Sequence, residues 1–253
     1  MLNFSDHESL NLGGRRISLT GPVDMQAAVC NKTSFEIRRA IRNGQIQPID
    51  GLNWDNDVVV AQATYSASNS VKLMNVANIS AIAVGALVRG NGVGREIYVS
   101  DVDIATNTIR VNAQLYDAIG TQEFTFMRFK YMLDFSGFTK MSDMIFDHNE
   151  FACGGEFSGV MLPSNGLVFQ VRDCSFDKPK NRGMTSQATG CQGIIIDRNM
   201  FVSDEQAIET RNRQSIAFNV NANDPQQSRG AVPSFLCVAG QWQHHREQSL
   251  VLR

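Results

Sequence analysis

The sequence contains three related octapeptides, Met144-Ile-Phe-Asp-His-Asn-Glu-Phe151, Phe169-Gln-Val-Arg-Asp-Cys-Ser-Phe176 and Ile194-Ile-Ile-Asp-Arg-Asn-Met-Phe201, at a spacing of 25 residues. Each octapeptide alternates apolar and variable residues, as a short strand does, and closes on a phenylalanine. A fixed period of this length is the signature of a solenoid, because one coil cannot bury its apolar face without a neighbour. The octapeptides therefore predict a stack of β-coils.

The repeat also predicts which side chains point into the solenoid. A fourth copy, Ile216–Ala222, begins 22 residues after the third. Stacking then gives three inward apolar ladders: Met144, Phe169, Ile194 and Ile216; Phe146, Val171, Ile196 and Phe218; and Phe151, Phe176 and Phe201. We expect Asn149 and Asn199, which bracket Cys174 in the repeat, to form an inward ladder whose amides hydrogen-bond from coil to coil. A second strand of each coil is expected at Phe157–Leu162, Met184–Ala188 and Gln206–Thr210.

The length of the coil indicates the kind of solenoid. A repeat of 22 to 25 residues is too long for a hexapeptide β-helix, and it lacks the leucine signature of a leucine-rich repeat. The chain therefore resembles an all-β, right-handed parallel β-helix, the architecture that pectate-lyase-like enzymes and phage tailspikes share.

Four regions of different pattern divide the chain. Residues 1–56 are expected to hold an irregular first coil and a capping helix, and residues 131–224 the parallel β-helix. Between them, residues 57–130 lose the period, and short strands at intervals of about ten residues predict a small inserted antiparallel β-domain. These strands are expected at Val58–Val60, Val71–Leu73, Ala86–Val88, Ile97–Val99, Thr108–Val111 and Glu123–Phe126. Residues 225–253 are expected to form an irregular C-terminal tail.

One short N-terminal helix is predicted over Phe35–Asn43. Thr33 and Glu36 have the spacing of a capping box, Ile37 and Ile41 share a face, and a glycine follows at position 44. We expect this helix to cover the open N-terminal end of the solenoid. Its basic residues, Arg38, Arg39 and Arg42, are expected to form a solvated face; a docking surface for an acidic partner is the alternative.

Composition excludes several classes of function. A net charge of -2 gives no electrostatic case for nucleic-acid binding. The five cysteines are far apart and form no Cys-x-x-Cys pair, so neither a zinc site nor a disulfide framework is indicated. The sequence contains neither an 18-residue apolar run nor a signal peptide, so we expect no membrane span and synthesis in the cytosol.

The candidate binding surface is an outward row of side chains beside the turn, formed by Asp147, Arg172, Asp197 and Asn219. Adjacent coils lie ~4.8 Å apart, which puts Asp147 and Asp197 roughly 9 to 10 Å apart, near the upper limit for an inverting glycosidase pair. Because Arg172 lies between them, a favourable charge ladder is the stronger interpretation, and we assign no catalytic residue. A mixed polar row of this kind suits polysaccharide binding.

No metal or cofactor site is predicted. His148 beside Asp147 is expected to be a surface residue, and the pair at His244-His245 lacks a third ligand at suitable spacing. Asp101 and Asp103 lack the glycine and glutamate of an EF-hand loop.

Three further stretches carry a more specific resemblance: Tyr131–Phe138, Asp173–Ser186 and Gly190–Asn199. They resemble a family of right-handed β-helix proteins encoded beside phage-like structural genes in alphaproteobacteria, including those of gene transfer agents. The resemblance implies a spike on the head or tail of a virion-like particle that attaches it to cell-surface polysaccharide. It also implies other particle proteins as partners and a homo-oligomer. A polysaccharide lyase or glycoside hydrolase of the pectate-lyase-like class is the alternative.

The solenoid pattern stops abruptly at Asp224, and a change of reading frame is one explanation. Read one base later, with synonymous codons chosen freely, residues 232–253 can encode a coil-like pattern. We therefore expect an out-of-frame extension here and a separate polypeptide that carries further coils.

Overall fold

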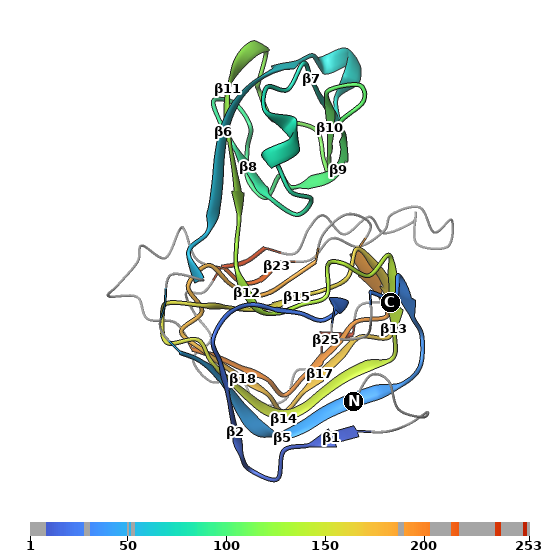
Figure 1. Ribbon diagram of the computed structural model, residues 1–253, viewed down its shortest axis with the longest axis vertical. Helices are drawn as coiled ribbons and strands as arrows, with labels where there is room; N and C mark the ends of the chain where they lie inside the picture. The colour runs from blue at the N-terminus through green and yellow to red at the C-terminus, as the bar shows by residue number, and fades with distance from the viewer. Residues whose placement is uncertain are drawn as a thin grey trace. The chain divides into compact units, whose positions relative to one another are not determined.

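The computed structural model describes residues 9–27, 31–49, 51, 54–186, 190–202, 214–217, 236–238 and 250–251. In these residues nearly all regular structure is β, and the chain forms two compact units (Figure 1). One unit contains the described residues up to Trp54 and those from Tyr131 onward, and the other contains Asp55–Lys130. Each has its own apolar core.

The first unit is a parallel β-solenoid. Its N-terminal coils contain β1 (Ser9–Asn11), β2 (Arg16–Leu19), β3 (Val23–Asp24), β4 (Ser34–Phe35) and β5 (Arg39–Pro48). The coils after the inserted unit contain β12 (Tyr131–Asp134), β13 (Lys140–Ser142), β14 (Met144–Ala152), β15 (Ser158–Met161), β16 (Asn165–Leu167), β17 (Gln170–Arg172), β18 (Ser175–Asp177), β19 (Arg182–Thr185), β20 (Gly190–Gln192), β21 (Ile195–Asp197), β22 (Met200–Val202) and β23 (Gln214–Ala217). Two further strands are β24 (Leu236–Val238) and β25 (Leu250–Val251).

Three sheets run along this solenoid, each made from one segment of successive coils. One sheet stacks β1, β5, β14, β17 and β21, continued by β2, β18 and β22 on the same coils. The second sheet stacks β3, β12, β15, β19 and β23, and the third stacks β4, β13, β16 and β20. Every pairing between these strands is parallel, and β5, β14 and β17 are seen side by side in Figure 1. The fold is therefore a β-helix, as the repeat predicts; its right-handed sense stays a prediction.

The second unit is the inserted antiparallel β-domain. It contains β6 (Asp57–Tyr65), a 3-10 turn at Ala67–Asn69, β7 (Lys72–Met74), a 3-10 turn at Ile79–Ala81, β8 (Leu87–Arg89), β9 (Val99–Asp103), β10 (Thr108–Val111) and β11 (Gly120–Arg128). The strand order is β8-β11-β6-β7-β10-β9. An antiparallel bridge between Leu87 and Tyr98 joins the two ends of this order, which closes the sheet into a small barrel. Five of the short strands predicted here overlap observed strands over two or more residues, whereas the strand expected at Ile97–Val99 begins at Val99 and runs to Asp103.

The inward ladders of the solenoid are also confirmed where the structure describes them. Met144, Phe169 and Ile194 are buried, as are Phe146, Val171 and Ile196. Phe176 lies between the two other closing phenylalanines, with ring centroids 4.5 Å from Phe151 and 4.9 Å from Phe201 and rings parallel to within 6°. The closing residue of each repeat thus forms a continuous aromatic stack.

The fourth repeat is assigned to the wrong sheet by the sequence pattern. Ile216 pairs with Met184 on β19, so β23 continues the second sheet and not the ladder of Ile194. The spacing of 22 residues resembles one coil, but the chain between β22 and β23 is longer than the corresponding connection in the earlier coils. Phe218, like the strand expected at Gln206–Thr210, lies outside the described residues.

The tail contributes two strands that do not extend the parallel stack. β24 pairs antiparallel with β23, and β25 pairs antiparallel with β21. Antiparallel pairing reverses the chain direction that a further coil requires. The described part of the tail therefore forms no parallel coil.

The predicted helix over Phe35–Asn43 is wrong, because this segment contains the last residue of β4 and the first half of β5. β5 pairs with β14 on one side and with β1 and β2 on the other. Ile41 and Ile46 are buried and lie in register with Phe146 and Phe151. Ladder bonds on both sides outweigh the weak preference of a nine-residue segment for helix.

Arg39 is a charged residue at a position where the other repeats have an apolar one, so the sequence pattern does not reveal this coil. It lies in register with Met144, on the first inward ladder, and is only 1% exposed. Its guanidinium lies over the ring of Phe35, 5.6 Å from the centroid, and donates to the carbonyl of Arg38 at 2.7 Å. The solvated basic face expected of a helix is therefore absent at Arg39.

The aromatic stack gives a direct test of the packing. Phe176→Ala is expected to lower the free energy of unfolding by roughly 3 to 5 kcal/mol, because it removes a fully buried ring between two others. Chemical denaturation measures the change. Leu167→Ala, on an exposed residue of the same coil, is the control and should change stability by about 0.5 kcal/mol or less. Equal effects of the two substitutions would contradict the stacked register.

Candidate functional site

A bend at one corner of the solenoid organises the candidate site. At this corner Asn43, His148, Asp173 and Arg198 all adopt the left-handed conformation, with φ between 49° and 56°. They follow one another on successive coils because β5, β14, β17 and β21 pair in register up to the bend. Residues with a side chain adopt this conformation at a cost, so its recurrence indicates that the stacking enforces it.

The residues directly after the bend hold adjacent coils together. Asn149 donates from Nδ2 to the carbonyl of Ile41 at 2.7 Å. Asn199 donates to the carbonyl of Val171 at 2.7 Å and accepts from the backbone N–H of Cys174 at 2.8 Å. The backbone N–H of Asn149 donates to Cys174 Sγ at 3.4 Å, which links the two asparagines. The predicted amide ladder is confirmed.

The outward row predicted from the sequence is present in register. In the strand register, Asp147 lies opposite Arg172 of the next coil, and Arg172 lies opposite Asp197 of the coil after it. The row extends one coil further than the sequence pattern indicates, because Arg42 on β5 pairs with Asp147. Asn219 lies outside the described residues, and the strand before it, β23, continues the second sheet, so the fourth repeat does not extend this row. The row therefore alternates in sign over four coils: Arg42, Asp147, Arg172 and Asp197.

The carboxylates of this row turn toward the corner residues. Asp147 Oδ1 lies 2.8 Å from Nδ1 of His148, and Asp197 Oδ2 accepts from Arg198 at 2.5 Å. Arg198 also makes two hydrogen bonds to Asp173, each 2.7 Å long. These two bonds hold the pKa of Asp173 below its ordinary value, and the same carboxylate raises the pKa of Arg198. Asp147 and Asp197 thus pair with the next residue of the chain, Asp173 pairs with Arg198 of the neighbouring coil, and the simple ladder between Asp147 and Arg172 is not formed.

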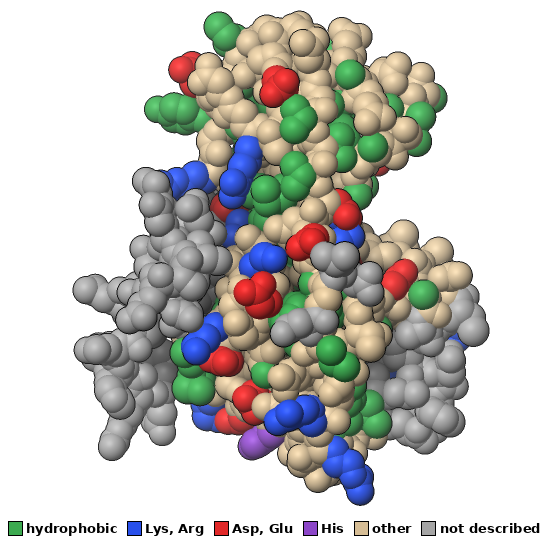
Figure 2. Space-filling model, turned by 60° about the vertical axis from the view of Figure 1, so that its left-hand side comes forward, with side chains coloured by type: hydrophobic (Ala, Val, Ile, Leu, Met, Phe, Trp, Pro, Cys, Tyr) green, Lys and Arg blue, Asp and Glu red, His purple; other side chains and the backbone are tan. Residues whose placement is uncertain are grey.

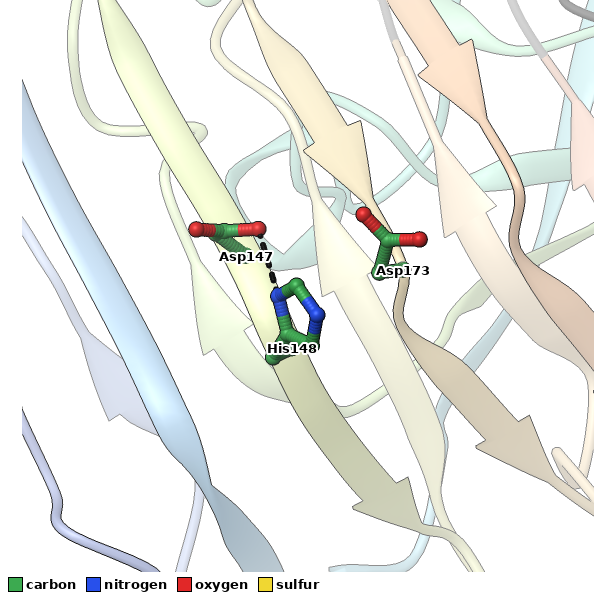
Figure 3. A group of neighbouring side chains, drawn as sticks. All are labelled: Asp147, His148 and Asp173. Carbon is green, nitrogen blue, oxygen red and sulfur yellow. Dashed lines mark hydrogen bonds and ion pairs between the residues drawn. The ribbon is translucent and has the colours of Figure 1, made fainter.

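Asp147, His148 and Asp173 are the described residues that bring metal-ligand atoms together, all within 4.8 Å of one another. Figure 3 shows the His148 imidazole facing Asp147, with Asp173 on the neighbouring coil. Both oxygens of Asp173 already accept hydrogen bonds from Arg198, and that guanidinium brings a positive charge to the cluster. A cation would have to displace it, so we assign no metal here.

The side chains of Arg42 and Arg172 make no hydrogen bond or ion pair to any residue that the structure describes. The Nε atom of each is buried and has no hydrogen-bond partner. Both side chains are half-buried on the outward row. Sequence reasoning missed Arg42 because its segment resembled a helix; its position two residues before Gly44, like Asp147 before Asn149, is the signal that identifies it.

An open groove follows the corner across the stacked coils. Residues from every described coil between β1 and β22 line it: Gly14, Asn43, Gly44, Gln45, His148, Asn149, Glu150, Asp173, Cys174, Ser175, Arg198 and Met200. Acidic and basic side chains are mixed over the solenoid face seen in Figure 2. The groove therefore offers hydrogen-bond donors and acceptors along the solenoid axis.

Cys153, Cys174 and Cys191 belong to the core of the solenoid. Burial raises the pKa of the Cys174 thiol to about 11 and that of Cys191 to about 12, and it also raises that of Cys153. A thiol with a raised pKa is a poor nucleophile at neutral pH. These residues act as small buried side chains, as the sequence predicts.

Comparisons with known proteins add little. No protein-family model and no curated protein matches the chain. Among solved structures, the tailspike protein gp49 from Pseudomonas phage LKA1 is similar over 78% of this chain, with 11% identity and a TM-score of 0.26. The chain spans 39% of the length of that tailspike. Among the described residues, no helix is long and apolar enough to cross a membrane.

The corner network predicts a specific pH response. Arg198→Gln should raise the pKa of Asp173 toward the ordinary ~3.9, because it removes two charge-assisted hydrogen bonds. A carboxyl NMR titration measures this pKa.

The same substitution should change acid stability. Because the folded-state pKa is lowered, pairing stabilises the fold above the unfolded-state pKa and is lost as the pH falls through the lower folded-state value. The variant should therefore lose less stability on acidification than the unaltered protein. The exposed Arg38→Gln is the control. An Asp173 pKa that is the same with and without Arg198 would contradict the assignment.

Proposed function

We propose that this protein is a structural and adhesive spike component of a phage-like particle, a phage or a gene transfer agent, that attaches the particle to recipient cell-surface polysaccharide. The observation that carries the proposal is the parallel register, which aligns Arg42, Asp147, Arg172 and Asp197 at one coil spacing of ~4.8 Å. A polysaccharide also repeats along one axis. Successive sugars can therefore meet successive coils.

The chemistry of the corner suits a hydroxyl-rich ligand. Carboxylates accept hydrogen bonds from sugar hydroxyls, and guanidinium and amide groups donate to them. The groove along the corner is open, so a chain can enter it from the side. Mixed charge over four coils matches a polymer better than it matches a compact metabolite.

The assembly forms part of the same proposal. We propose a homo-oligomer that contacts other particle proteins. Several copies on one particle would raise the apparent affinity for a polymer with many equivalent sites, since later contacts form at high effective concentration. This multivalency allows a weak site on each chain to support stable attachment.

Cell attachment tests the proposal. Purified full-length protein, labelled with a fluorophore, should bind recipient cells and lose binding to cells stripped of surface polysaccharide. Purified particles should contain the protein. Binding that is unaffected by removal of the polysaccharide, or absence of the protein from particles, would contradict the proposal.

A polysaccharide lyase or glycoside hydrolase is the second candidate function. The pairing of His148 with Asp147 favours it, because an imidazole beside a carboxylate can move a proton. Asp147 and Asp197 lie two coils apart, roughly 9 to 10 Å at the backbone. Depolymerisation of a polysaccharide by the purified protein, abolished in Asp147→Asn with Asp197→Asn, would establish an enzyme. Binding without depolymerisation supports adhesion.

A further inference from the structure

The outward row contains two arginines whose side chains form no hydrogen bond or ion pair within the described part of the protein. Arg42 and Arg172 point outward from alternate coils, with Asp147 in register between them. Neither side chain forms an ion pair or hydrogen bond with any described residue, and the Nε atom of each is buried. Buried donors are almost always satisfied in native proteins, and charged ones are the most costly to leave unpaired. This arrangement is what a site for an anionic ligand requires.

The neighbouring acids do not satisfy these arginines. Asp147 bonds His148, and Asp197 bonds Arg198, so both carboxylates are drawn toward the corner. The two guanidinium groups remain, separated by two coil spacings, about 10 Å. A guanidinium binds a carboxylate or sulfate through two parallel hydrogen bonds, which gives strength and orientation.

From this geometry we propose that Arg42 and Arg172 recognise an acidic polysaccharide that carries an anionic group on alternate sugars. The inference rests on the proposed function and names the class of polysaccharide. An extended sugar chain advances by about one coil spacing per sugar, so anions on alternate sugars meet arginines on alternate coils. Asp147 and Asp197 face the intervening sugars, and their charge disfavours a polymer with an anion on every sugar. The alternating signs therefore select the charge pattern of the ligand.

The test measures binding of the full chain to defined polymers. Hyaluronan and desulfated chondroitin have a carboxylate on alternate sugars, chondroitin sulfate adds sulfate esters, polygalacturonate has a carboxylate on every sugar, and dextran is neutral. Polymers with alternating anions should bind most tightly. Comparison of the two chondroitins distinguishes carboxylate from sulfate as the recognised group. Binding should weaken as the salt concentration rises, because ions screen the attraction.

Substitutions identify the arginines as the cause. Arg42→Gln and Arg172→Gln should each weaken binding to the alternating polymer about tenfold or more. Arg38→Gln removes the same charge from an exposed residue of the Arg42 coil and should leave affinity unchanged. Circular dichroism and thermal melting of each variant establish that the fold is retained.

The outcomes separate this inference from the proposed function. Unchanged binding in both arginine variants, or tighter binding of dextran or polygalacturonate, would overturn the inference and leave polysaccharide adhesion intact. Preferential binding of single-stranded DNA would overturn the inference as well. Cell attachment that does not depend on polysaccharide would remove the proposed function and this inference together.

Discussion

The hydrogen bonds that Asn149 and Asn199 make across the corner are the constraint on which the solenoid depends. Each amide reaches the backbone of the preceding coil, so every coil has to bend at the same residue as its neighbour. A slip of one residue would turn all inward side chains outward, because side chains alternate along a strand. The corner therefore sets the register of both halves of the bent sheet.

Two features on opposite faces of the sheet follow from that register. On the inside, the three closing phenylalanines meet face to face, four residues beyond the outward-facing position before the bend of their coils. On the outside, the charged row alternates in sign. The stack stabilises the fold through burial, whereas the row places half-buried charged groups on the outer face. Core and candidate binding surface thus have one geometric origin.

The bend also decides which charges pair. At a left-handed residue the chain turns sharply, which brings the side chains of His148 and Arg198 beside the carboxylates that precede them in the chain. The carboxylates consequently bond their sequence neighbours and not the arginines of the next coil. Arg42 and Arg172 keep their donors for another partner. The sequence predicts that the charges of the outward row neutralise one another, but in the structure the side chains of its two arginines have no acidic partner.

The sequence by itself determined the repeat, the inward ladders, the amide corner and the inserted antiparallel domain, because these depend on local alternation and on a period of 25 residues. Only the tertiary structure decided the rest. Thr33 and Glu36 are typical of a helix start, yet pairing on both sides makes the segment a strand, with Arg39 in an apolar position. The segment at Ile216 has the pattern of the next repeat, but it lies in another sheet because the connection before it is longer than in the earlier coils. Which charged side chains of the row pair with each other depends on the directions of the side chains at the bend. The spacing of residue types in the sequence gives no information on these directions.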